Sequence, residues 1–566
     1  MKKKEDKLHP LVYELKDSVD KGKLTRRDFI RYATLLGVSS TMASQLLILG
    51  CGKEEEAKKE TAAEKKVEET SAPEIKRGGT LKISQQIQKI DHPARYSWLM
   101  PSNSMRMIFE YMTLTDRDNI THPYLCKDWS ASDDLKTWTF NVREGIKFNN
   151  GDPFTADDCI FTINQWLDKD VKSSLLGLVG AYLDPTGIEK VNDYQFKLNL
   201  KRPEIAIPEH FFQYTAQVLN HRTFEGDMKK APHGTGPYLL DTYNEGEICI
   251  VKARTDYWQN GADGKPLPYM DEIRFIDMGG ELAPQIAALK SGEIDLIDAS
   301  DNPGPQIMMA VKEDDNINVL PVATATTRVL RMRVDMDPWT DNRVRTALKL
   351  CQNREKILAL AYQGEGLLGQ DFHVYPKHPE YCEKPIPKYD PEKAKALLTE
   401  AGFSNGIDIN LAVGSEWTDI VRYAEVLKED AAPAGIRVNI QTMPTSQYWE
   451  KWTEVDLGVT PWTHRPLGTM VPNLAYVADD EGKPVPWNET RWVDKEFSEL
   501  LAQASGTLDV DKRRQIFCKL EQIQMDRGSI GIAYWMNTWM CPNKRLMNVD
   551  SHPNLIFLFN EAWLET

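Results

Sequence analysis

Few residues of this chain form a pattern that catalyses a reaction. The stretch from Gly364 to Gly369 matches the G-x-G-x-x-G fingerprint of dinucleotide-binding loops. That fingerprint needs a strand before the glycines and a helix after them, because the pyrophosphate binds at the helix N-terminus. Here a predicted helix, Arg354 to Tyr362, comes before the glycines, so we interpret the stretch as a loop. The chain has no G-x-S-x-G, H-E-x-x-H or P-loop motif, and its ten histidines are scattered. We expect neither enzymatic activity nor a cofactor.

Thiol and metal chemistry also have weak support. The eight cysteines include no C-x-x-C pair, and four of them lie in apolar periodic segments, where Cys acts as a small hydrophobic residue: Cys159, Cys249, Cys351 and Cys518. We expect no disulfide framework and no thiolate zinc site, and the sequence leaves open whether any single pair forms. The segment around Trp462 has one histidine, His464, without a second one at ligand spacing, so we expect no tightly bound metal.

The first 50 residues have the pattern of an export signal. Arg26 and Arg27 precede an uncharged, weakly apolar run from Tyr32 to Gly50, which resembles a twin-arginine signal. The run ends in Leu47-Ile48-Leu49-Gly50-Cys51, which resembles a bacterial lipobox, with Cys51 as the lipidated first residue of the mature chain. We expect residues 1–50 to be removed and a diacylglyceryl group to anchor the protein. The alternative is a core helix with a chance pair of arginines.

Composition separates a spacer from the folded body. Residues 51–77 are rich in Lys, Glu, Ala and Thr and are almost without large apolar residues, which predicts a flexible tether or a solvated helix. Beyond residue 77 the chain holds 52 basic and 70 acidic residues, a net charge of −18. Such a surface repels phosphate backbones, so we expect no nucleic-acid partner.

The folded body alternates short apolar strands with amphipathic helices. We predict a helix capped by Thr155, a helix from Pro284 to Ser291 that Gly292 ends, and a helix from Pro391 that stops at Gly402. Apolar strands follow the second and third helices, at residues 294–297 and 409–413. Mixed strand and helix units over this length predict α/β lobes, which place ligands at sheet edges or between lobes.

Several motifs together resemble the family 5 extracellular solute-binding proteins, the large peptide, nickel and oligosaccharide receptors of ABC importers. The matching segments follow in order from Gly78 to about Asn560: Arg77 to Ile83, Ile108 to Met112, Phe148 to Asp158, Gly234 to Tyr238, Asp256 to Trp258, Asp341 to Arg345, and Asp511 to Arg513. These motifs indicate the fold and not the ligand, because most of them are turns and helix starts.

The resemblance implies a two-lobed, type II periplasmic-binding-protein-like clamp with an extra subdomain and two hinge crossings. Lobe I would comprise residues 78–320 and 534–566, with the subdomain at about 116–228. Lobe II would comprise residues 321–533. The protein would be an extracytoplasmic, lipid-anchored monomer that captures a solute and delivers it to ABC permease subunits.

The ligand class depends on one segment. Many peptide-binding members carry Trp-x-x-Asp after a second-lobe strand, where the carboxylate pairs the peptide's ammonium. This chain has Trp462-Thr463-His464-Arg465, so the charge is reversed, and it resembles a branch that continues Pro-Leu-Gly and later has Pro486-Trp487-Asn488-Glu489. An ammonium beside Arg465 would meet a like charge. The structural alternatives are an ion pair for Arg465 and an ordinary core position for Trp462.

We therefore expect a receptor for a peptide or peptide-like solute with an anionic group. The predicted ligand-binding residues are Trp462, His464, Arg465, Trp417 and Trp535, with Tyr448, Trp449 and Tyr534 as further candidates for the wall of the cleft. The alternatives are a receptor for sugars or other non-peptide solutes, a non-transport sensor, and a secreted enzyme on the same fold.

Overall fold

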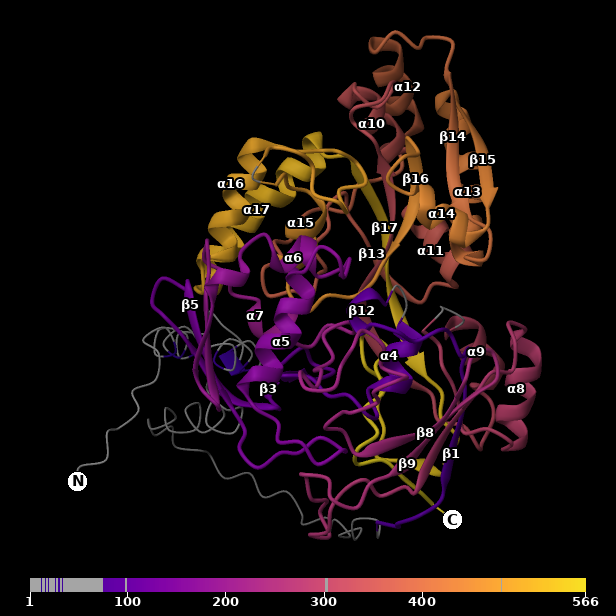
Figure 1. Ribbon diagram of the computed structural model, residues 1–566. Helices are drawn as coiled ribbons and strands as arrows, with labels where there is room; N and C mark the ends of the chain where they lie inside the picture. The colour runs from indigo at the N-terminus through magenta and orange to yellow at the C-terminus, as the bar shows by residue number, and fades with distance from the viewer. Residues whose placement is uncertain are drawn as a thin grey trace, which may run out of the picture.

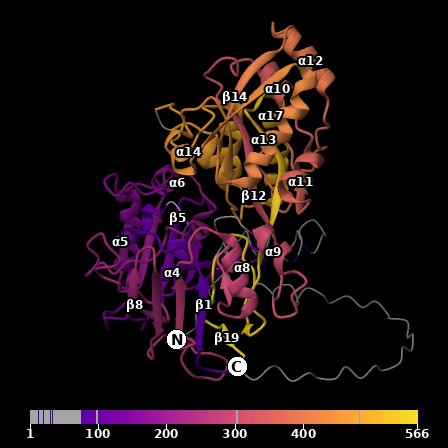
Figure 2. The same ribbon diagram turned by 90° about the vertical axis from the view of Figure 1, so that its right-hand side faces the viewer.

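The computed structural model describes residues 75–565 apart from 97–98, 301–303 and 480, and seven helical positions before them: 12, 16, 19, 26, 29, 30 and 33. Within the described body the chain forms two lobes of mixed α/β structure (Figures 1 and 2). Figure 2 shows one lobe with β14 and α10 to α13 above the other, which carries β1, β8 and α8, and β12 runs between them.

The lower lobe is built on a five-stranded sheet in the order β11-β1-β10-β9-β8. The opening strand β1 lies inside this sheet, parallel to both β10 and β11, and its Leu81 and Ile83 are fully buried. The strands are β1 (Thr80–Ser84), β8 (Tyr238–Asn244), β9 (Ile248–Ala253), β10 (Glu272–Ile276) and β11 (Leu296–Ile297). The helices α4 (Leu99–Met105), α8 (Leu282–Ser291) and α9 (Gly304–Val311) belong to the same lobe.

A four-stranded sheet, β4-β5-β7-β6, lies within the region where we expect the subdomain. Its strands are β4 (Cys126–Ala131), β5 (Thr137–Val142), β6 (Ile188–Asn192) and β7 (Gln195–Asn199), with β2 (Thr113–Thr115) paired to β3 (Thr121–Pro123) before them. The region also contains α5 (Ala156–Leu167), α6 (Leu176–Val179), α7 (Ile207–His210) and the short helix η2 (Pro185–Gly187). Another short helix, η1 (Pro93–Arg95), precedes it in the sequence. Thr155 and Asp158 form the predicted capping box of α5.

The upper lobe is built on a six-stranded sheet in the order β13-β17-β12-β16-β14-β15. Its strands are β12 (Leu320–Met332), β13 (Gly366–Leu368), β14 (Ile407–Gly414), β15 (Ile436–Met443), β16 (Leu457–Trp462) and β17 (Ile530–Met540). The long strands β12 and β17 are antiparallel neighbours, with Leu320 opposite Met540. The hinge crossings that we place near residues 320 and 534 fall in this strand pair, and the lobe boundaries themselves stay a prediction.

Helices cover the upper sheet and continue toward the subdomain (Figure 1). They are α10 (Asn342–Leu350), α11 (Arg354–Tyr362), α12 (Pro391–Glu400), α13 (Thr418–Ala431), η3 (Ala432–Ala434), α14 (Thr445–Lys451), α15 (Met470–Ala475), α16 (Lys495–Ser505) and α17 (Val510–Arg527). One apolar core joins Trp138 and Phe140 of the subdomain to Tyr476 and Phe517 beside and within the α15 to α17 layer. The chain ends in the hairpin of β18 (Leu546–Met547) and β19 (Trp563–Leu564).

The predicted end of α8 and the predicted N-cap of α12 are confirmed. Gly292 ends α8 in the left-handed conformation, with φ 76°, and Asp390 caps α12 by accepting from the Lys393 amide. The interpretation of Gly364 to Gly369 as a loop is wrong in part, because Gly366 to Leu368 pair with the long strand β17 as the short edge strand β13. Three residues are too few for an alternating pattern, so this strand had no sequence signal.

The expectation for Cys518 as a small hydrophobic residue is wrong, because Cys518 of α17 forms a disulfide with Cys382. The two cysteines are 136 positions apart, and only the folded chain brings them together. The loop that carries Cys382 is also held by its backbone amide, which donates to Glu521 one turn further along α17. The other cysteines among the described residues are free and buried: Cys126, Cys159, Cys249, Cys351 and Cys541.

The predicted export signal, lipobox and tether lie largely outside the described residues. Arg26 is a described position, helical and exposed, whereas Arg27, Cys51 and residues 51–74 are not described. Among the helices that the structure describes, none has the length and apolar composition that crossing a bilayer requires.

Candidate functional site

A cleft of about 690 Å³ lies between the two lobes. Side chains of the lower lobe and its subdomain form one side, and the second-lobe strands β12 and β16 with their following loops form the other. This volume is in the range of sites that enclose a small solute. The lower side includes Arg95, Tyr96, Leu99, Lys172, Gln213 and Tyr214.

Four of the five predicted ligand-binding residues line this cleft. They are Trp417, Trp462, His464 and Arg465, and the further candidate Trp449 lines it too. Trp535 does not belong to the lining; it is 1% exposed and packs behind, against the rings of His373 and Tyr375. Tyr448 and Tyr534 are fully buried and also lie outside the lining. The error for Trp535 follows from strand β17, where alternate side chains point to opposite faces.

The end of strand β16 positions the central segment. Trp462 is the last residue of β16 and faces Thr327 of β12 across the antiparallel pair. Its indole Nε1 donates to Glu489 Oε1 at 2.8 Å, and Thr460 Oγ1 donates to the other carboxylate oxygen at 2.6 Å. Burial raises the pKa of Glu489. Glu489 therefore fixes the ring of Trp462 from behind the wall and is itself fully buried.

Both ring nitrogens of His464 form hydrogen bonds within the protein. Its Nδ1 accepts from the backbone amide of Ala325 at 2.9 Å, so the proton of the neutral ring is on Nε2. Nε2 lies 2.7 Å from Asn119 Oδ1, to which it donates. Asn119 is in the β2–β3 turn of the subdomain, so His464 connects this turn to strand β12. Both ring nitrogens of His464 thus have protein partners, and the residue lines the cleft.

Arg465 is a buried cation in the lining of the cleft. It is 9% exposed, and its Nη1 donates to Thr463 Oγ1 at 2.8 Å and to the His464 carbonyl at 3.0 Å. Among the described residues no carboxylate forms an ion pair with it, so the structural alternative of an ion pair has no partner here. Burial lowers its pKa, yet a guanidinium stays charged in proteins.

The groups around Arg465 are neutral. Burial, and secondly the charge of Arg465, lower the pKa of His210 to about 3. Burial, followed by the charges of His378 and Arg465, lowers the pKa of His373 to about 3 as well. Tyr214 faces Arg465, and burial raises the pKa of its phenol. An uncompensated buried charge costs several kcal/mol, which an anion in the cleft would offset.

The rest of the lining also favours an anion. Arg95 and Lys172 add positive charge on the lower side, with Arg95 Nη1 3.9 Å from Asp91. Arg328 is neutralised by Asp419 at 2.5 Å. The lining residues within the described part of the chain include no Asp or Glu. The same part of the chain has no group of three His, Cys, Asp or Glu side chains placed to hold a metal.

Sequence reasoning missed several lining residues. Trp452 and Trp487 complete a run of tryptophans on the upper side, and Arg95, Lys172 and Tyr214 contribute from the lower side. Trp487 had a signal, because it is part of the Pro-Trp-Asn-Glu segment that also supplies Glu489. The lower-lobe residues had none, since they come from three loops that are distant in the sequence.

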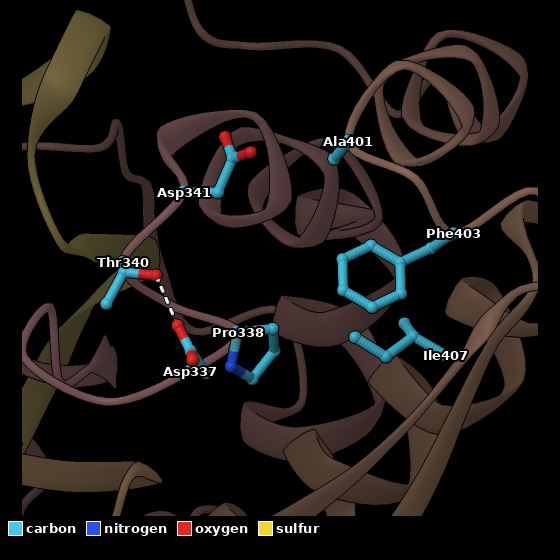
Figure 3. A pocket seen from close by; sticks show the side chains of 7 residues that line it. All are labelled: Asp337, Pro338, Thr340, Asp341, Ala401, Phe403 and Ile407. Carbon is cyan, nitrogen blue, oxygen red and sulfur yellow. Dashed lines mark hydrogen bonds between the residues drawn. The ribbon is translucent and has the colours of Figure 1, made fainter.

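A second cavity, of about 520 Å³, opens on the upper lobe away from the cleft. Figure 3 shows Phe403 and Ile407 facing Pro338, with Thr340 bonded to Asp337. Asp341, the other carboxylate here, caps α10 and pairs with Arg343 at 2.6 Å. Asp341 thus has a cation as partner and Asp337 a hydroxyl, and the charged residues in the lining of this cavity are acidic.

Comparison with known proteins identifies the family. The family model of bacterial extracellular solute-binding proteins, family 5, middle region, matches residues 121–481. The di/tripeptide-binding protein 1 of Pseudomonas aeruginosa (strain UCBPP-PA14) is 27% identical over 72% of this chain and 79% of its own length. The dipeptide-binding protein of Escherichia coli (strain K12) is 26% identical over the same shares.

Solved structures share the fold. The binding protein AgaA of A. tumefaciens R10, in complex with agropinic acid, superposes with a TM-score of 0.74 at 20% identity and covers 86% of this chain and 99% of its own. The fold is therefore the two-lobed clamp that the sequence predicts. Since the family model covers well over half of the chain, this protein belongs to family 5 of the bacterial extracellular solute-binding proteins.

Proposed function

We propose that the protein captures an anionic, peptide-like solute outside the cytoplasm and delivers it to an ABC permease. The observation that carries this proposal is Arg465, a buried guanidinium that lines the cleft and has no carboxylate partner among the described residues. A carboxylate of the solute would form a charge-assisted, bidentate pair with it. An ammonium in the same place would add a second uncompensated cation.

The relatives support the solute class in outline. Two of them are named for di- and tripeptides and for dipeptides, and a structure of the same fold holds agropinic acid. Peptide-like size agrees with the 690 Å³ cleft. A receptor for sugars would not need a buried cation, and the cleft shows no residue set for covalent catalysis, so both alternatives lack the support that Arg465 gives.

The test begins with a thermal-shift screen of peptides, N-acylated amino acids, sugars and organic acids. For the anionic solutes that bind, Arg465→Ala should weaken binding about 10- to 100-fold, and Arg465→Asp should weaken it more. The control is Arg437→Ala, which removes an exposed arginine paired with Asp408 at 2.7 Å on the far strand β15. Unchanged affinity in Arg465→Ala, or binding of sugars alone, would contradict the proposal.

The targeting part is tested separately. Changing Arg26 and Arg27 together to Lys should leave precursor in the cytoplasm, because the export receptor reads the pair as an address. Cys51→Ala should abolish labelling with a radioactive fatty acid. Normal export of the double Lys variant would show that another pathway carries the protein. We also propose that the mature protein is a lipid-anchored monomer, which size-exclusion chromatography with light scattering of a chain starting at residue 78 would check.

A further inference from the structure

Five of the chain's 15 tryptophans form one continuous wall on the upper side of the cleft. Ring centroids are 5.4 Å apart for Trp417 and Trp449, 5.5 Å for Trp449 and Trp452, 6.2 Å for Trp452 and Trp487, and 6.0 Å for Trp487 and Trp462. The wall spans the start of α13, helix α14, the loop before α16 and the end of β16. Four separate elements thus converge on one aromatic surface.

The wall leaves indole surface uncovered. Trp417 and Trp462 are 6% and 5% exposed, whereas Trp449, Trp452 and Trp487 are only partly buried although they line the cleft. Large aromatic surface facing water is unfavourable, and a solute that covers it gains binding free energy in proportion to the area buried. The partly buried indoles are therefore the surface that a solute would cover on lobe closure.

The angles between neighbouring indole planes favour a particular shape of solute. Neighbouring indole planes meet at 68° to 83°, so each pair forms a corner. A flat ring in such a corner stacks on one indole while its edge meets the face of the next, and aromatic pairs of this kind gain energy beyond the area buried. A branched aliphatic group fills the same corner but gains area alone.

We infer that the solute carries a flat aromatic ring beside its anionic group, with the ring in a corner of the tryptophan wall and the anion on Arg465. The two subsites share one cleft, because Trp462 of the wall and Arg465 both line it. A quaternary ammonium also binds indole faces. The positive charges of Arg95, Lys172 and Arg465 in the same lining disfavour binding of a quaternary ammonium. This inference rests on the proposed function.

The test compares four probes by isothermal titration calorimetry: N-acetyl-L-phenylalanine, N-acetyl-L-leucine, N-acetyl-L-alanine and trimethylglycine. We expect the phenylalanine derivative to bind about 2- to 12-fold more tightly than the leucine derivative, and the alanine derivative most weakly of the three acids. Trp452→Leu and Trp487→Leu should abolish that preference and change the affinity for the leucine derivative less than twofold. Trp487→Phe should retain the preference, and the control Trp535→Phe, behind the lining, should leave it unchanged.

The outcomes separate the two proposals. Equal affinity for the phenylalanine and leucine derivatives would overturn the ring inference and leave the anionic receptor standing. Tighter binding of trimethylglycine than of any acid would assign the wall to a quaternary ammonium and overturn the ring inference too. Failure of every acid to bind, with no effect of Arg465→Ala in the wider screen, would overturn the proposed function and the inference with it. If a Leu variant fails to fold, the preference of the unmodified protein decides.

Discussion

Arg465 at the face of the cleft has different partners from the buried arginines in the interior of the second lobe. In the interior, Arg354 pairs with Asp371 at 2.5 Å, and Arg513 pairs with Glu380 at 3.0 Å. Within the described part of the chain Arg345 has no such pair and instead donates to the carbonyl oxygens of Trp339, Thr340, Arg527 and Gly528. At the cleft, Arg465 has one hydroxyl and one carbonyl. Arg465 thus has no carboxylate partner among the described residues, and the proposed function assigns that role to an anionic solute.

A buried carboxyl shows why this difference is informative. Glu521, close to the Cys382–Cys518 disulfide, accepts from the Cys382 amide and has no cation bonded to it among the described residues. Burial raises its pKa to about 9, so it takes a proton and becomes neutral. A guanidinium has no such route, since it stays protonated throughout the accessible pH range. A buried arginine therefore keeps a charge that carbonyl oxygens, as at Arg345, or an anion must compensate, whereas an unpaired buried glutamate can become neutral.

The largest expected effect comes from removing the counter-ion of an interior arginine. Glu380→Ala should lower the free energy of unfolding by about 3–5 kcal/mol, because Arg513 would be left buried without its carboxylate. Glu380 also accepts from the Gly468 amide at 3.1 Å, so a backbone partner is lost too. Urea unfolding measures the change. The exposed control Glu499→Ala, which breaks a pair at 3.8 Å with Lys495, should stay within about 0.5 kcal/mol.

A small change in the free energy of unfolding of Glu380→Ala would contradict the comparison between Arg513 and Arg465. If the loss were below about 1 kcal/mol, buried arginines of this lobe would tolerate the absence of a counter-ion. The state of Arg465 would then no longer point to an anionic solute.

The second effect is a pH dependence that Glu521 should produce. Its folded-state pKa of about 9 lies above the ordinary value of 4.5, so its contribution to stability is complete below pH 4.5 and is lost as the pH rises to about 9. The free energy of unfolding of Glu521→Gln should therefore rise relative to that of the unmodified protein across this window, by on the order of a few kcal/mol. Urea unfolding at pH 5, 7 and 9 measures it, and a constant difference would show that Glu521 is ionised in the folded protein.

Arg465 should respond to substitution in the direction opposite to that of the interior arginines. Arg465→Met removes an uncompensated buried charge and keeps much of the side-chain volume, so the free energy of unfolding should rise by about 1–3 kcal/mol in the absence of solute. Arg513→Met should lower it, since Glu380 would lose its cation. Thermal and urea unfolding of the two variants give the comparison directly. A loss of stability in Arg465→Met would assign that residue to the structure of the protein.

The fold was largely predictable because its signals are local or come in long ordered series. The caps at Thr155 and Asp390 and the stop at Gly292 each depend on a few neighbouring residues, and all three appear where the sequence places them. The edge strand β13 and the Cys382–Cys518 disulfide depend on partners more than 100 residues away. A single sequence does not show which distant residues pair in the folded chain.

The cleft was predictable only on one side. Trp462 and Arg465 were predicted from the resemblance to the Trp-x-x-Asp segment of peptide-binding family members, and Trp462 is the last residue of β16. The role of Trp535 could not, because its indole points to the buried face of β17 and the direction depends on strand register. His464 was expected to contact the solute, but its neighbours Ala325 and Asn119 occupy its nitrogens, and neither is near it in the sequence.

The smallest effect would show whether the cleft face is held in place by the subdomain. Asn119 has φ 62°, a left-handed conformation that glycine also adopts, so Asn119→Gly removes the side chain without backbone strain. The lost hydrogen bond to His464 Nε2 is worth about 0.5–1.5 kcal/mol. Because His464 precedes Arg465, we expect this loss to appear as about 2- to 12-fold weaker binding of an anionic solute, with the free energy of unfolding changed by less than about 1 kcal/mol. Asn119→Asp keeps an acceptor for Nε2 and should bind within about twofold of the unmodified protein. Calorimetry with the solute from the screen measures both variants, and equal weakening in the two would show that the turn, and not its bond to His464, sets the position of Arg465.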